Sequence, residues 1–85
     1  MKAVRFHRHG GPDVLVYEEA PDPAGGAGRA IVRVHACALN HLDLWQRRGI
    51  DRVRVPLPHI SGSDVSGVVV DDGGGAVPAG TRVFV

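Results

Sequence analysis

Apolar and polar residues alternate along several short stretches of the chain, and residues that favour turns separate these stretches. The clearest alternation runs from Ile31 to Leu39. Because side chains of a strand point alternately to its two faces, this pattern predicts a strand with a core face of small and branched residues. That face comprises Val32, Val34, Ala36 and Ala38. Further strands are predicted over residues 2–7, 14–19, 65–70 and 82–85.

A single helix is predicted over residues 41–48. Asn40 precedes it as a capping residue, and Gly49 follows it as a stop. Arg47 and Arg48 lie near its C-terminal end, where positive charge is favourable. Short strands, frequent Gly and Pro turns and one short helix predict a mainly β fold, either a small sandwich or a partly open barrel.

Composition narrows the class of protein. A chain of 85 residues forms at most one small domain. The formal net charge is +1 and the ten basic residues form no run, so nucleic-acid binding has no support. One cysteine excludes an internal disulfide, and no stretch approaches about 18 uninterrupted apolar residues. We therefore expect a cytoplasmic protein with no membrane partner.

Common chemical motifs are absent. Gly62 and Gly67 have the separation of glycines in a phosphate-binding loop, but Val68 and Val69 stand where Lys and Ser or Thr are needed. We interpret the glycines as turn residues. No two histidines pair at helical spacing to bind a metal, and Cys37 is expected to be a small packing residue.

The stretch from residue 40 to residue 70 carries a specific resemblance. Its motifs are Asn40-x-x-Asp43 with Arg47 and Gly49, and Pro58-x-Ile60-x-Gly62-x-Asp64-x-x-Gly67-Val68-Val69. In order and spacing they resemble the N-terminal GroES-like catalytic domain of medium-chain dehydrogenases/reductases. The resemblance implies a partly open GroES-like barrel with one short helix, formed by residues 1–85 as the truncated first part of a two-domain dehydrogenase. The nicotinamide-binding Rossmann domain is then absent from this chain.

Within that superfamily, zinc-dependent alcohol dehydrogenases carry a cysteine ligand where this chain has Asn40. They carry a histidine-glutamate pair where it has Ser63 and Asp64. Asn is a poor zinc ligand and Ser a weak one, so no catalytic zinc is expected. The sequence is instead similar to the quinone oxidoreductases and a related zinc-type-like branch. Leu42 and Trp45 stand where alcohol dehydrogenases place proton-relay groups, and neither side chain passes a proton.

The resemblance implies an NADPH-dependent oxidoreductase that transfers hydride to a quinone, enone or aldehyde, and that is a homodimer when full length. The cofactor is bound mainly by the missing domain, so the fragment alone is expected to be inactive. Asn40, Asp43 and Asp64 are the predicted catalytic residues, and His41 is predicted to contact the cofactor pyrophosphate.

Each of these residues also has a plain structural interpretation. Asn40 and Asp43 suit a helix cap, His41 suits an exposed helix position, and Asp64 suits the start of a strand. Trp45 either walls a substrate pocket or belongs to the core.

Two other functions stay open. One is a zinc-dependent alcohol dehydrogenase with unusual ligands, namely His41, Asp43 and Asp64 with a partner from the missing region. The other is a GroES-like binding module that shares only the barrel and assembles into a ring.

Overall fold

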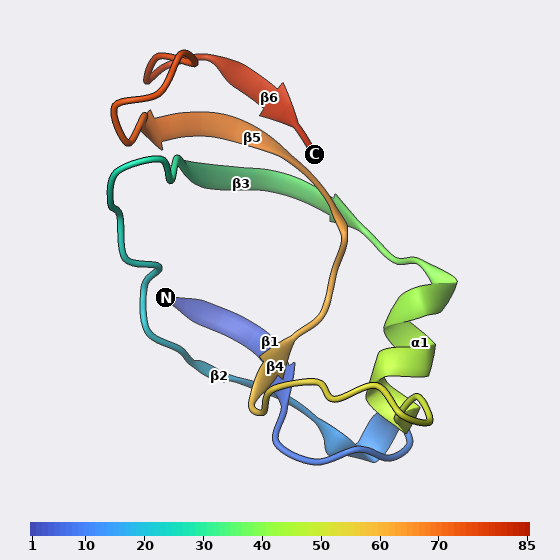
Figure 1. Cartoon of the computed structure of the whole chain (residues 1–85). Coiled ribbons are helices and arrows are strands. Elements are labelled where there is room, and N and C mark those ends of the chain that lie inside the picture. The colour runs from blue at the N-terminus through green and yellow to red at the C-terminus, as the bar shows by residue number, and fades with distance from the viewer. The chain divides into compact units, whose positions relative to one another are not determined.

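The structure, a computed structural model, describes all 85 residues and divides them into two compact units. The first unit comprises Met1–Pro21 and Leu39–Gly62, and the second comprises Asp22–Ala38 and Ser63–Val85. Each unit contains one three-stranded antiparallel sheet (Figure 1). The prediction of a mainly β chain with one short helix is confirmed.

The sheet of the first unit has the order β2-β1-β4. Its strands are β1 (Lys2–Phe6), β2 (Leu15–Glu19) and β4 (His59–Ile60), and the short 3₁₀ helix η1 (Pro12–Val14) leads into β2. Phe6 is fully buried, and the rings of His9 and His59 lie on it with centroid distances of 5.8 Å and 5.5 Å. One aromatic ring thus anchors the core of this unit.

An ion cluster links β1 to β2. Arg5 Nε donates to Glu18 Oε1 at 2.6 Å, and the His7 ring nitrogen Nε2 contacts the same carboxylate oxygen. These hydrogen bonds, first from Arg5 and then from His7, lower the pKa of the Glu18 carboxyl from its usual value of 4.5. The cluster therefore adds electrostatic pairing to the strand register in which Val4 faces Tyr17.

Helix α1 (His41–Arg48) has the predicted boundaries. Asn40 is its N-cap, and Gly49 ends it at a φ of 98°, where a residue without a side chain is favoured. The Gly49 N–H donates to the Trp45 carbonyl oxygen at 2.9 Å. Arg47 is buried, its Nε donates to the Gly10 carbonyl oxygen at 3.2 Å, and this contact fixes the end of the helix to the η1 loop.

The sheet of the second unit has the order β3-β5-β6. Its strands are β3 (Ile31–Ala38), β5 (Asp64–Asp71) and β6 (Arg82–Phe84). A register shift places Val34 opposite Gly67 but Ala36 opposite Ser66, so His35 is an extra residue in β3. A Cβ at Gly67 would lie 2.1 Å from the Arg33 carbonyl oxygen, so only glycine fits beside this bulge.

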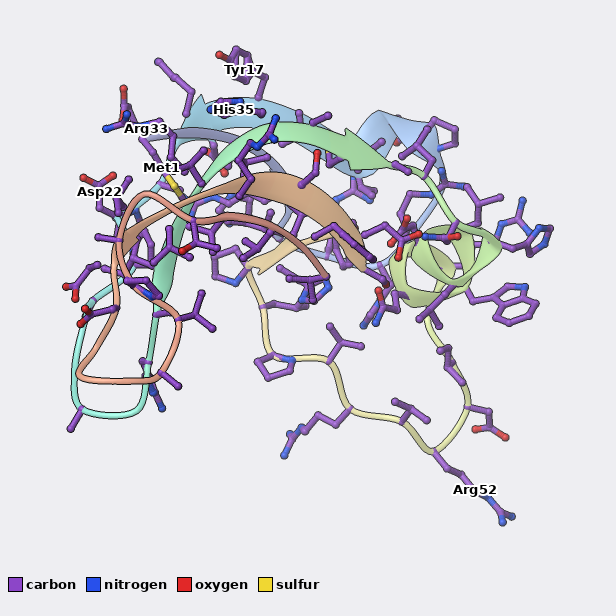
Figure 2. The ribbon with its side chains drawn as sticks, turned by 90° about the horizontal axis from the view of Figure 1, so that it is seen from above. Met1, Tyr17, Asp22, Arg33, His35 and Arg52 are labelled. Carbon is purple, nitrogen blue, oxygen red and sulfur yellow. The ribbon has the colours of Figure 1, made fainter.

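The predicted core face of β3 is not buried. Every residue from 33 to 38 is exposed, including Val34 at 56%, and Arg33 and His35 lie on the surface of the strand (Figure 2). Simple alternation fails here because both faces of the strand are exposed from residue 33 to residue 38, so neither face forms a core. The bulge at His35 also exchanges the two faces midway along the strand. Cys37, expected to pack internally, is exposed as well.

Candidate functional site

Three of the four predicted site residues lie together at the N-terminal end of α1. Asp43 is buried, with 6% of its surface exposed, and its carboxylate accepts two backbone hydrogen bonds. Oδ2 accepts from the Asn40 N–H at 2.9 Å, and Oδ1 accepts from the Gly62 N–H at 3.0 Å. Asp43 therefore joins the start of the helix to the segment that follows β4.

Asn40 and Asp43 also form a capping box, so their capping role is confirmed. One carboxylate thus holds two backbone N–H groups in a place that water barely reaches. With one bond on each oxygen and little exposed surface, Asp43 is poorly placed to bind a metal or exchange protons with a substrate. Its geometry suits holding other groups in position.

His41 is exposed on the first turn of α1. Its ring makes an edge-on contact with the Trp45 ring, with a centroid distance of 5.1 Å and an interplanar angle of 65°. Residues four apart in a helix share a face, so the helix geometry explains this pair. The contact orients the His41 ring, and the proposed pyrophosphate contact stays a prediction.

The helix reverses the usual amphipathic arrangement. Its buried residues are the charged Asp43 and Arg47, whereas Trp45 is 51% exposed and Leu42 is 39% exposed. The interpretation of Trp45 as a core residue is thus wrong. Polar groups can face inward here because each meets backbone partners, and α1 presents an apolar side to its surroundings.

Asp64 belongs to the second unit. It is the first residue of β5, it pairs with Ala38, and it lines an open hollow of about 310 Å³ together with Cys37 and Ser66. The strand-start interpretation of Asp64 is confirmed, and its catalytic role stays a prediction.

Sequence reasoning did not find two features of the first unit. The Gly62 N–H that binds Asp43 is a backbone group, and no residue pattern marks it. The second feature is a hollow lined by Arg52 and Arg54. The alternation of basic and apolar residues in Arg52-Val53-Arg54-Val55 is the sequence pattern that could have indicated this hollow.

No three His, Cys, Asp or Glu side chains come together in the structure in a way that could hold a metal ion. The alternative zinc site needs Asp43 as a ligand, and both oxygens of Asp43 already accept backbone hydrogen bonds. The geometry of this chain therefore does not favour that alternative. The expectation that the full-length protein lacks catalytic zinc stays a prediction.

Comparison with known proteins decides the family. The family described as "Alcohol dehydrogenase GroES-like domain" matches residues 26–85. The chain belongs to this family. Within the medium-chain dehydrogenase/reductase superfamily, this GroES-like chain is 37% identical over 87 residues to a quinone oxidoreductase from Rattus norvegicus. That match covers 99% of the chain and 26% of the relative.

Solved structures show the same likeness. A crystal structure of an NAD-dependent alcohol dehydrogenase matches with a TM-score of 0.90 and 42% identity, over 100% of this chain and 25% of that protein. An Escherichia coli quinone oxidoreductase complexed with NADPH matches with a TM-score of 0.83 and 33% identity, and the match covers 99% of this chain and 26% of that protein. The GroES-like chain thus spans about a quarter of the length of these proteins. No helix in it combines the length and the apolar character needed to cross a membrane.

Proposed function

We propose that this GroES-like chain is the first part of an NADPH-dependent oxidoreductase that reduces a quinone, enone or aldehyde without catalytic zinc. The observation that carries the proposal is Asn40 at the N-cap of α1, a neutral amide at the position where zinc-dependent alcohol dehydrogenases carry a cysteine ligand. Its backbone N–H is held by the Asp43 carboxylate, which also accepts from the Gly62 N–H. The similarity to quinone oxidoreductases supports the reaction class. The other domain of the protein carries most of the cofactor site, and residues 1–85 alone are inactive.

Bound NADPH supplies the hydride, so the chain itself needs no nucleophile. Its task is to favour the negative charge that grows on the substrate oxygen. Asn40 has the right chemistry, because its amide N–H₂ is a neutral donor that does not titrate. Its position at the N-cap of α1 is fixed by the bond from its backbone N–H to Asp43.

In this proposal Asp43 is a positioning residue. It orders Asn40 from one side and Gly62 from the other, so that the donor is fixed before the substrate arrives. Such preorganisation matters because each donor acts without reorganising during the reaction. Trp45 and Leu42 provide an apolar wall on the exposed side of the helix, which suits a quinone ring.

His41 and Asp64 complete the proposal. The exposed His41 ring, held by Trp45, is assigned to the cofactor phosphates. Asp64 is assigned to the catalytic centre as an acidic group at the start of β5. The enzyme acts as a homodimer in the cytoplasm on a small-molecule substrate.

Kinetics of the protein as its gene encodes it test the proposal. We expect Asn40→Ala to lower kcat/KM for a quinone by about 100-fold with NADPH binding little changed, as for loss of one transition-state donor. Asp43→Asn should lower kcat as well, and no change of pH should restore the lost activity. Asp51→Asn is the control, because Asp51 is exposed and makes no hydrogen bond or ion pair.

Two results would count against the proposal. If the kcat/KM of Asn40→Ala is within twofold of wild type, Asn40 is not the hydrogen-bond donor to the substrate oxygen. Loss of activity on mild chelation, with the fold intact and zinc restoring turnover, establishes the zinc-dependent alternative.

A further inference from the structure

The loop after α1 forms a hollow that the proposed function does not use. It has a volume of about 520 Å³, within the range of small-molecule sites, and it is open to solvent. Its lining consists of His9, Arg52, Val53, Arg54, Val55 and Leu57. Apolar side chains thus share this hollow with two guanidinium groups and an imidazole ring.

The charge of the two arginines is uncompensated. Arg52 and Arg54 are exposed, and neither guanidinium forms an ion pair or hydrogen bond within the chain. Asp51 is the neighbouring acid along the loop, but it does not line the hollow. The lining of the hollow therefore contains two arginines and no acidic residue.

His9 adds a third polar group. Its Nδ1 donates to the Gln46 carbonyl oxygen at 2.9 Å, because a carbonyl can only accept. This bond fixes the ring, so the imidazole is a fixed polar wall of the hollow; in the neutral ring with its proton on Nδ1, Nε2 is an acceptor and does not donate to an anion. Contact with the buried Phe6 ring holds the imidazole in place from the other side.

The backbone at Arg52 is strained. Arg52 has a φ of 64°, in the left-handed region, within a tight turn closed by the bond from the Val53 N–H to the Ile50 carbonyl oxygen at 3.1 Å. Glycine or asparagine is usual at such a position. Residues held in such conformations cluster at active sites and ligand sites. Figure 2 shows the Arg52 side chain extending outward from the tip of the loop.

We propose that this hollow binds a small amphipathic anion, a carboxylate or phosphate ester on an apolar body. A guanidinium group can engage the oxygens of such an anion in bidentate hydrogen bonds, and both Arg52 and Arg54 line the hollow. Val53, Val55 and Leu57 contact the apolar body. The inference needs neither hydride transfer nor NADPH, so it stands apart from the proposed function.

Isothermal titration of the protein as its gene encodes it, with octanoate as the probe, tests the inference. We expect about millimolar affinity for octanoate, at least about tenfold weaker binding of octanol, and weaker binding at high salt. Octyl phosphate distinguishes a phosphate ester from a carboxylate as the preferred group, and either preference supports an anion site. Inorganic phosphate alone should bind at least about tenfold more weakly than octanoate, since it lacks the apolar body.

Variants separate binding from folding. Arg52→Gly should weaken octanoate binding by about 3- to 10-fold, while the Tm stays the same or rises because the positive φ is relieved. Arg52→Asn, which also tolerates this φ, should behave alike, and Arg54→Gln should lose binding to a similar extent. Arg33→Gln is the matched control: it removes the same charge from an exposed, unpaired arginine of the second unit and should leave binding unchanged.

Three results would overturn the inference. They are equal affinity for octanol and octanoate, equal loss of affinity in Arg33→Gln and Arg54→Gln, and a Tm that falls in Arg52→Gly while octanoate binding is retained. The last result would show that Arg52 is present for the fold and not for a ligand.

Discussion

Replacement of Asp43 by alanine removes the group that ties the start of α1 to Gly62. Two hydrogen bonds are lost at once, from the N–H groups of Asn40 and Gly62 at 2.9 Å and 3.0 Å. The buried position of the carboxylate means that water does not replace it directly in the folded protein. We therefore expect this end of the helix to open far more often in the variant.

The size of the effect follows from these two bonds. A hydrogen bond to a charged group contributes about 1.5–3 kcal/mol, so the two together set an upper bound of about 6 kcal/mol. Asn40 and Gly62 are themselves exposed, and after truncation water can solvate their N–H groups in part. We therefore expect about 2–3 kcal/mol, more than the roughly 1 kcal/mol typical of a lost helix cap. Asp43→Asn keeps one acceptor oxygen and should cost about half as much.

Native-state hydrogen exchange of the α1 amides measures the free energy of opening this end of the helix, both in residues 1–85 and in a longer protein that contains them. A loss of about 2–3 kcal/mol in the opening free energy predicts exchange that is roughly 30- to 150-fold faster for the amides of α1. Asp51→Ala, which removes an exposed carboxylate without partners, should change exchange less than about twofold. Exchange in Asp43→Ala within a factor of three of wild type would refute the reasoning.

Three further predictions concern the two sheets. Gly67→Ala should unfold the second unit or destabilise it by about 3 kcal/mol or more in urea titration, since a Cβ would lie 2.1 Å from a carbonyl oxygen of the neighbouring strand; a midpoint equal to wild type would contradict the bulge geometry. Hydrogen bonds from Arg5 and His7 lower the pKa of Glu18 below 4.5, so the stability that they give is present above about pH 4.5 and is lost as pH falls through the lowered pKa. The urea midpoint should fall less between pH 7 and pH 3 in Glu18→Gln than in wild type. An equal fall in the two proteins would show that the cluster of Arg5, His7 and Glu18 does not contribute to the pH dependence of stability. β6 is an edge strand on which Phe84 is 88% exposed, and we expect this apolar edge to make copies of the 85-residue chain associate. Phe84→Asp should therefore reduce light scattering, and unchanged scattering would exclude β6 as the site of association.

The sequence predicted the helix and the five longer strands because local rules decide them. Asn40 and Gly49 mark the ends of α1, and the turns rich in Gly and Pro mark the ends of the strands. The two-residue strand β4 (His59–Ile60) was missed, since a pairing this short leaves no periodic pattern in the sequence. Its existence depends on β1, which is more than fifty residues earlier in the chain.

Burial was harder to predict than secondary structure. Both faces of β3 are exposed from residue 33 to residue 38, so its alternation does not mark a core face. The residue types around His35 also do not indicate that it is an extra residue in the strand. On α1 the apolar Trp45 is exposed and the charged Asp43 is buried, because the backbone N–H groups that satisfy Asp43 come from Asn40 and from the distant Gly62. Sequence patterns predict which side chains prefer the core, and they do not contain such backbone partners.

The candidate site was predicted in part for the same reason. The spacing of Asn40 and Asp43 gave their place on the helix and their capping role. It could not separate a catalytic carboxylate from one that is used to hold the backbone, since that distinction rests on the Gly62 N–H. The Arg52 hollow was missed because a positive φ and an unpaired charge become visible only in the folded chain.

The most direct test of the central claim is hydride transfer in metal-free protein. The protein as its gene encodes it is stripped of metal by a chelator and dialysed, its metal content is measured, and oxidation of NADPH by a naphthoquinone is followed by absorbance. The account predicts turnover that is unchanged by metal removal, with deuterium passing from deuterated NADPH to the product. Turnover that disappears with the metal and returns with added zinc would contradict it.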